Sequence, residues 1–216
     1  MTSHIFPIDI DSVDTRRPGA YGLLIRHGER EPITTENNNM LGAQLTGAGR
    51  AQARQLGVRL RGQRSHLFFS SPVARCVDTN VCILEGLGVD PEAARQRAEP
   101  HPVLVEAYME NPETAKAVFR LSDPEQVILD YLSGRDVPGF GPIERGARAL
   151  LRFVRNNIQS GTLSIFVTHD ALVMPFRQHF LGDEYRRDSW LPFLGGSVIY
   201  TEGERTWVDG REVCPI

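Results

Sequence analysis

The chain has 216 residues, of which 41% are hydrophobic and 24% are charged, and its formal net charge is −3. This length fits one domain, or one domain with a small appendage, and it suffices to bury a core without disulfide bonds. A weakly acidic chain has no overall positive field, which excludes nucleic acid and an anionic membrane surface as the first candidate partners.

Nothing in the chain predicts a membrane-spanning or secreted protein. No apolar run approaches the roughly 18 residues of a membrane span. The first residues lack the basic start and apolar core of a secretory signal. The three cysteines are too few for a disulfide scaffold and match no zinc-ligand spacing. We therefore expect a cytoplasmic protein without a metal site.

The first quarter of the chain predicts an arm, a strand and a helix. Residues 1–19 are polar and interrupted by Pro and Gly, and we expect an extended arm there. The apolar run at 21–26 predicts a strand, and a loop over 28–44 follows it. Thr46 is a typical N-cap, and the small and apolar residues after it recur at helical spacing as far as Gly62.

The middle of the chain alternates strands with helices. The run at 67–71 predicts a second strand, and a helix follows over about 73–86. Residues 103–105 are a third possible strand. Asn111 precedes a proline that begins a short helix, and Ser122 begins a capping box ahead of another helix.

The last third carries the strongest helical pattern, at 142–160. The strand predicted at 163–168 leads into a helix that ends near residue 181 and tolerates Pro175 in its first turn. Residues 197–208 predict a hairpin. Strands alternating with helices indicate an α/β protein of three layers, in which helices cover both faces of a mostly parallel sheet. We expect one domain over 1–216, with 88–141 as a small helical cap.

Polar side chains that could take part in catalysis or binding follow several of the predicted strands. His27 follows the first strand, Arg75 the second, and His169 with Asp170 a later one. In open α/β sheets, ligands bind at the carboxyl ends of the strands. These side chains are therefore expected to meet in one site.

The residue types suit the cleavage of a phosphomonoester. Arg26, Arg30 and Arg75 can bind phosphate oxygens through charge-assisted hydrogen bonds, and a neutral His27 can attack phosphorus to form a phosphohistidine. His169 is a further phosphate donor. Asp170 can protonate the leaving oxygen if it carries a proton itself, which predicts faster turnover at acidic pH.

Four motifs in chain order resemble those of the histidine phosphatase superfamily. Residues 26–32 read R-H-G-x-R-x-P and residues 169–170 read H-D, as in its acid phosphatase and phytase branch. Residues 70–79 resemble the element S-S-P-x-x-R-x-x-x-T, and residues 45–49 resemble L-T-x-x-G. The chain is much shorter than that branch usually is, and has the size of the phosphoglycerate mutase-like branch.

The resemblance implies a phosphoglycerate mutase-like fold and no metal or organic cofactor. By position it implies that His27 is the phosphorylated nucleophile and that Asp170 donates the proton. In the phosphoglycerate mutase-like branch a Glu from the middle of the chain is often the acid, and Glu106 is the alternative donor here. The phosphate pocket would be formed by Arg26, Arg30, Arg75 and His169.

The leading hypothesis is a phosphatase that acts on a small phosphorylated molecule or a phosphoprotein. A phosphomutase, a phosphohistidine-protein phosphatase and a non-catalytic phosphate-binding module stay open as alternatives. Tyr185, Trp190 and Phe193 precede the predicted hairpin, and we expect them to pack in the core or loop rather than to line the pocket.

Overall fold

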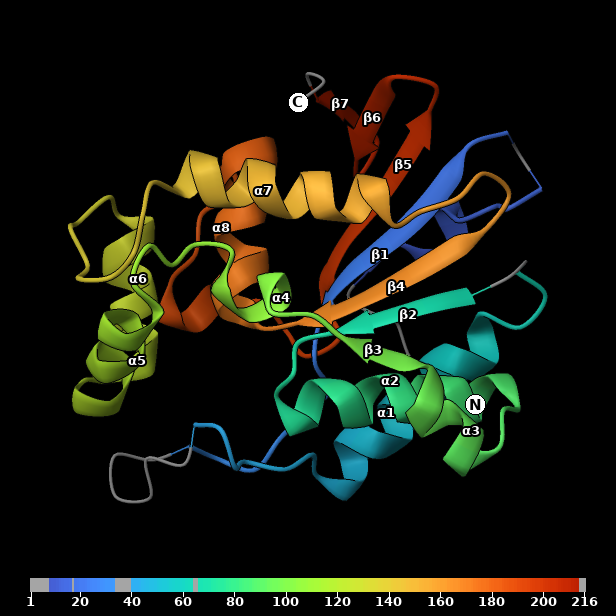
Figure 1. Cartoon of the computed structure of the whole chain (residues 1–216), viewed down its shortest axis with the longest axis horizontal. Coiled ribbons are helices and arrows are strands. Elements are labelled where there is room, and N and C mark those ends of the chain that lie inside the picture. The colour runs from blue at the N-terminus through green and yellow to red at the C-terminus, as the bar shows by residue number, and fades with distance from the viewer. Residues whose placement is uncertain (1–7, 17, 34–39, 64–65, 214–216) are drawn as a thin grey trace.

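The computed structural model of the chain describes residues 8–16, 18–33, 40–63 and 66–213. These residues form a single seven-stranded sheet with helices on both faces (Figure 1). In chain order its strands are β1 (Ala20–Arg26), β2 (His66–Ser70), β3 (Ala98–Pro100), β4 (Leu163–Thr168), β5 (Gly196–Glu202), β6 (Arg205–Val208) and β7 (Arg211–Val213). The helices are α1 (Gly47–Arg59), α2 (Ala74–Leu87), α3 (Pro91–Arg97), α4 (Val103–Glu106), α5 (Pro112–Leu121), α6 (Pro124–Leu132), α7 (Ile143–Asn156) and α8 (Asp170–Leu181).

The sheet has the order β3-β2-β4-β1-β5-β6-β7. Its first four strands are parallel, β5 is antiparallel to β1, and β5, β6 and β7 form an antiparallel meander. Every residue of β1 and β4 is buried, as expected for parallel strands covered on both faces. The predicted α/β class and the predicted hairpin are both confirmed.

Alternate residues of β1 point to two separate hydrophobic cores. Leu23 and Ile25 join the core beneath α1 and α2, whereas Leu24 joins the core beneath α7 and α8. In Figure 1, α7 accordingly lies on one side of the sheet and α1, α2 and α3 lie on the other. The carboxyl ends of the central strands emerge between these two layers.

The small residues predicted on α1 allow a close contact with α2. A Cβ atom on Gly57 would lie 2.0 Å from the carbonyl oxygen of Ile83, and one on Gly86 would lie 2.0 Å from that of Arg54. The two helix backbones therefore touch, and no larger side chain fits at either position. This contact fixes α2, which carries Arg75 in its first turn.

The cap is smaller than the predicted segment 88–141. Within that segment, β3 pairs with β2, and α3 packs against α2, so both belong to the main layers. The helices α4, α5 and α6 remain over the ends of the strands, with α6 packed against α8.

The strand predicted at 103–105 is wrong, because these residues form most of the helix α4. A short apolar run does not distinguish a strand from a buried helical turn. Strand β3 ends at Pro100, and the backbone N–H of His101 still donates to Ser70. The chain then turns, since the imidazole Nδ1 of His101 accepts from Val103 N–H at 3.2 Å. Glu106 consequently ends a helix rather than following a strand.

Two further expectations are wrong in detail. The described part of the predicted arm contains a 3₁₀ turn at Ile10–Ser12, and Ile8, Ile10 and Val13 are buried in the core beneath α1. Residues 1–7 and 17 of that arm, and residues 34–39 of the predicted loop, lie outside the described residues. Pro175 lies in the second turn of α8, not the first. Among the described residues, no helix is long and apolar enough to cross a membrane.

Candidate active site

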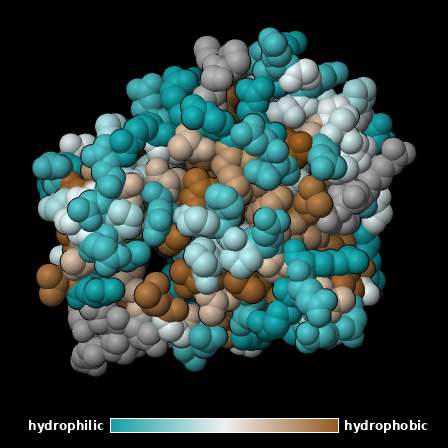
Figure 2. All heavy atoms as spheres, in the orientation of Figure 1, coloured by the Kyte–Doolittle hydropathy of each residue, from teal (hydrophilic) through white to brown (hydrophobic). Residues whose placement is uncertain are grey.

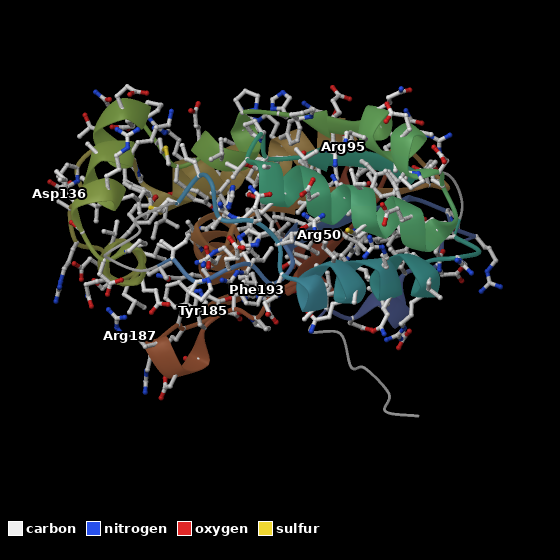
Figure 3. The ribbon with its side chains drawn as sticks, turned by 90° about the horizontal axis from the view of Figure 1, so that it is seen from below. Arg50, Arg95, Asp136, Tyr185, Arg187 and Phe193 are labelled. Carbon is white, nitrogen blue, oxygen red and sulfur yellow. The ribbon has the colours of Figure 1, made fainter. Side chains whose placement is uncertain are left out.

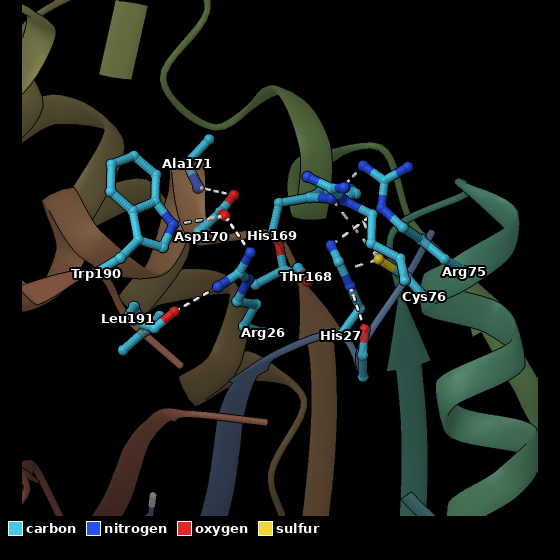
Figure 4. A network of polar contacts seen from close by, with 12 residues as sticks. Arg26, His27, Arg75, Cys76, Thr168, His169, Asp170, Ala171, Trp190 and Leu191 are labelled. Carbon is cyan, nitrogen blue, oxygen red and sulfur yellow. Dashed lines mark hydrogen bonds and ion pairs between the residues drawn. The ribbon is translucent and has the colours of Figure 1, made fainter. Parts of the chain in front are cut away.

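The imidazole of His27 is held in one tautomer at the carboxyl end of β1 (Figure 4). Its Nδ1–H group donates to the carbonyl oxygen of Gly28 at 2.8 Å, and its Nε2 accepts from Nε of Arg75 at 3.0 Å. An arginine only donates, so the lone pair of His27 is on Nε2. Burial, and then the charge of Arg75, lowers the pKa of His27 to about 3. The ring is therefore a neutral base near neutral pH.

Arg75 joins the two histidines of the site. While its Nε contacts His27, its Nη2 donates to Nδ1 of His169 at 3.1 Å. Its backbone is fixed by Thr79, whose hydroxyl donates to the carbonyl oxygen of Arg75 at 2.7 Å and accepts from Gly28 N–H at 3.0 Å. The Thr of the S-S-P-x-x-R-x-x-x-T element thus links α2 to the loop that carries His27.

His169 lies beside His27 because their strands are neighbours in parallel register. Arg26 pairs with Thr168, so the next residue of each strand emerges at the same edge of the sheet, and the two ring centroids are 5.4 Å apart. Nε2 of His169 donates to the Ser71 hydroxyl at 2.9 Å. Burial, and then the charge of Arg75, lowers the pKa of His169 well below its ordinary value.

Asp170, at the N-terminus of α8, accepts hydrogen bonds on both carboxylate oxygens. Oδ2 lies 2.7 Å from Nη2 of Arg26 and accepts from Nε1 of Trp190 at 2.9 Å. Oδ1 accepts from Ala171 N–H at 2.9 Å. Burial opposes ionisation, but the Arg26 charge above all outweighs it and holds the pKa of Asp170 below its usual range. Asp170 is therefore an anion in this structure, and faster turnover at acidic pH through a protonated Asp170 stays a prediction.

Arg26 is held on three sides. Besides Asp170, it donates through Nη1 to the carbonyl oxygen of Leu191, and its guanidinium lies 4.0 Å from the centroid of the Phe193 ring. Its buried Nε has no hydrogen-bond partner within the part of the chain that the structure describes. This N–H is thus a donor that a phosphate oxygen could satisfy.

Two aromatic residues of the loop between α8 and β5 contact the site, although packing in the core or loop was the preferred prediction for them. Trp190 and Phe193 were expected to pack, yet one contacts Asp170 and the other contacts Arg26. In Figure 3, Tyr185 and Arg187 of this loop lie toward the lower edge of the view, and Phe193 lies closer to the middle of the molecule. Tyr185 instead bonds to Arg177 in a separate cluster. The only sequence signal was the aromatic character of the loop, which carries no fixed spacing.

The L-T-x-x-G element joins the start of α1 to the loop that follows His27. The hydroxyl of Thr46 accepts from Gly49 N–H at 3.0 Å, which confirms the predicted N-cap, and it donates to the Glu29 carboxylate at 3.0 Å. A Cβ on Gly49 would lie 2.1 Å from the carbonyl oxygen of Glu29. The start of α1 therefore presses directly against the loop that follows His27.

A pocket of about 150 Å³ opens over these groups. The structure brings six of the seven predicted residues into its lining, namely Arg26, His27, Arg30, Arg75, His169 and Asp170. Arg30 is half-buried and donates to the carbonyl oxygen of Glu31 at 2.8 Å. Glu106 does not line the pocket, but it pairs at 3.2 Å with Lys116, which does. Among the described residues, no group of His, Cys, Asp and Glu is arranged to hold a metal ion.

The sequence matches the family model of the histidine phosphatase superfamily (branch 1) over residues 23–205, so the chain belongs to this family. No curated protein matches it. The predicted acid phosphatase and phytase branch is not confirmed, since the match is to branch 1.

Solved structures share the fold at low sequence identity. A phosphoglycerate mutase from Bacillus anthracis str. Sterne is 13% identical over 93% of either chain, with a TM-score of 0.58. The ecdysone phosphate phosphatase of Bombix mori is 18% identical, over 90% of this chain and 92% of that chain, with a TM-score of 0.52. A mycobacterial glucosyl-3-phosphoglycerate phosphatase is 18% identical, over 84% and 89%, with a TM-score of 0.52. These neighbours confirm the phosphoglycerate mutase-like fold, and they include both phosphatases and a mutase.

Proposed function

We propose that the protein is a phosphomonoester hydrolase that forms a covalent phosphohistidine on His27. One observation carries the proposal: the neutral imidazole of His27 keeps its lone pair on Nε2, against the guanidinium of Arg75 and beside His169. A buried imidazole with an unprotonated Nε2 next to fixed cations suits attack on a phosphate group.

In the first step, the entering phosphate takes over the hydrogen bonds that Arg75 now gives to the two imidazoles. Charge-assisted bonds to phosphate are stronger than these bonds to neutral rings. Release of Arg75 Nε frees the Nε2 lone pair of His27, which forms a bond to phosphorus as the ester P–O bond breaks. Water then attacks phosphorus, the P–N bond to His27 breaks, inorganic phosphate leaves, and the water proton passes to the carboxylate of the group that protonated the leaving oxygen.

The contacts of the two candidate proton donors support a different role for each. Asp170 accepts two hydrogen bonds and forms an ion pair with the buried Arg26, whose charge it neutralises. Glu106 lies at the margin of the pocket, is one-third exposed and can reach a proton from solvent. We therefore propose that Glu106 protonates the leaving oxygen and that Asp170 positions Arg26. This reverses the order of preference that the motifs alone suggested.

Trapping the intermediate tests the proposal. Wild-type protein mixed with a ³²P-labelled phosphomonoester and quenched in base should retain label on one histidine, because phosphohistidine is stable in base and labile in acid. His27→Asn should retain none, whereas His179→Asn, a change on the outer part of α8, should behave as wild type. Full phosphatase activity in His27→Asn contradicts the proposal.

The rival activity within the family is phosphoryl transfer to a second hydroxyl. Labelled enzyme chased with water alone should release inorganic phosphate as fast as enzyme chased with water plus an acceptor alcohol. Preferential transfer of label to the alcohol would replace the hydrolase with a mutase. The cytoplasmic location and the choice between a small substrate and a phosphoprotein stay predictions.

A further inference from the structure

The pocket above the phosphate-binding groups has apolar walls. The cap contributes Val105 of α4, Met109 just after α4, Phe119 of α5 and Ile128 of α6. Trp190 closes the opposite side. On the face seen in Figure 2, hydrophobic residues border part of a hollow between the cap helices and the centre of the molecule.

The described part of these walls lacks neutral hydrogen-bonding side chains. Among the described residues that line the pocket there is no Ser, Thr, Asn, Gln or Tyr. A sugar or glycerol leaving group would bring several hydroxyls against this surface. Each hydroxyl that loses water without gaining a partner weakens binding.

Two of the charged side chains around the walls are already paired with other charges. Lys116 lies 3.2 Å from Glu106 and 3.3 Å from Glu113. Glu125 lies 2.9 Å from Arg187, which comes from the loop between α8 and β5. These pairs lower the capacity of the walls to bind a polar leaving group, while the cations of the floor remain directed at the phosphate.

We infer that the site takes phosphomonoesters of a compact apolar alcohol or phenol, with a single aromatic ring or a short branched chain as the leaving group. The inference rests on the proposed function for the phosphate end of the substrate. The pocket of about 150 Å³ is lined by the phosphate-binding residues as well as by the apolar walls, so the space left beside a phosphate group suits only a small leaving group. Burial of the ring against Met109, Phe119 and Ile128 supplies the selectivity.

The test compares kcat/KM for benzyl phosphate and glycerol 1-phosphate, which are both esters of primary alcohols. We expect benzyl phosphate to be preferred about 100-fold. Met109→Gln, which places an amide in the wall at similar volume, should reduce the preference about tenfold. Met109→Leu keeps the wall apolar and should retain the preference. Leu121→Gln should also retain it, because this side chain ends α5 outside the pocket and is 87% exposed.

Equal rates for the two esters, or a preference for glycerol 1-phosphate, would overturn the substrate class while leaving a phosphatase in place. A binding assay separates this result from failure of the proposed function. Benzylphosphonate cannot be hydrolysed, and it should bind at least tenfold more tightly than 2-hydroxyethylphosphonate in calorimetry. If no ester is hydrolysed but this difference appears, the proposed function fails and the apolar pocket stands. If the two phosphonates bind equally, the inference fails whatever the turnover.

Discussion

The assignment of Glu106 and Asp170 to different roles predicts opposite patterns in two matched variants. Glu106→Gln removes the proposed acid, and loss of a general acid costs about 10² to 10⁴ in rate. The loss should appear with an alkyl phosphate, whose alkoxide needs a proton. It should be less than about tenfold with 4-nitrophenyl phosphate, whose phenolate leaves without one.

Asp170→Asn acts on Arg26 instead. The ion pair spans 2.7 Å between side chains that are 7% and 17% exposed, so the variant leaves a buried guanidinium without its counter-charge. Such a loss costs about 3 kcal/mol in the free energy of unfolding. Because Arg26 is proposed to bind the phosphate group whatever the leaving group, kcat/KM should fall by a similar factor for both substrates.

The assay measures kcat/KM on both esters and a urea unfolding curve for each variant. Glu113→Gln is the matched control, because Glu113 is the other partner of Lys116, at 3.3 Å, and is 83% exposed. This control should leave both rates near those of the wild type. A selective loss on the alkyl ester in Asp170→Asn, with no such loss in Glu106→Gln, would refute the reasoning and restore Asp170 as the donor.

Three further outcomes follow from the site. The pKa of His27 is about 3 in the folded protein and about 6.5 in the unfolded chain, so the unfolded chain takes up a proton first and stability falls as the pH drops. Urea unfolding curves should show that His27 contributes about 2 kcal/mol less to the free energy of unfolding at pH 5 than at pH 8. His27→Gln should abolish this contribution to the pH dependence. Gly49→Ala should destabilise the protein by about 2 kcal/mol and slow turnover, because the new methyl group meets the backbone of Glu29. Gly47→Ala should do neither, because a Cβ there has nothing within 4 Å. Equal melting curves for the two variants would contradict the close contact between Gly49 and Glu29. Trp190→Phe removes the hydrogen bond to Asp170 and should cost about 1 kcal/mol of stability. The variant should also lose kcat/KM to the same extent on all esters. A loss confined to one leaving group would argue against a role of Trp190 in positioning Asp170.

Much of the fold was readable from local patterns. Apolar runs and caps depend on neighbours a few residues away, so the strands at 21–26 and 163–168 and the N-cap Thr46 could be predicted directly. The strand predicted at 103–105 was wrong, because an apolar run of three residues has the same pattern in a strand and in a helical turn. The extent of the cap could not be predicted from local patterns either, because the pairing of β3 with β2 is a tertiary contact.

The sequence by itself determined which chemical groups the site contains, since His27, Arg75, His169 and Asp170 all stand beside predicted elements in recognisable motifs. Only the tertiary structure decided their states. The register of β1 with β4 sets the two imidazoles side by side, and the contact with Arg26 favours the ionised form of Asp170. Hydrogen bonding and pKa depend on burial and on charges from distant segments, and no local pattern encodes these.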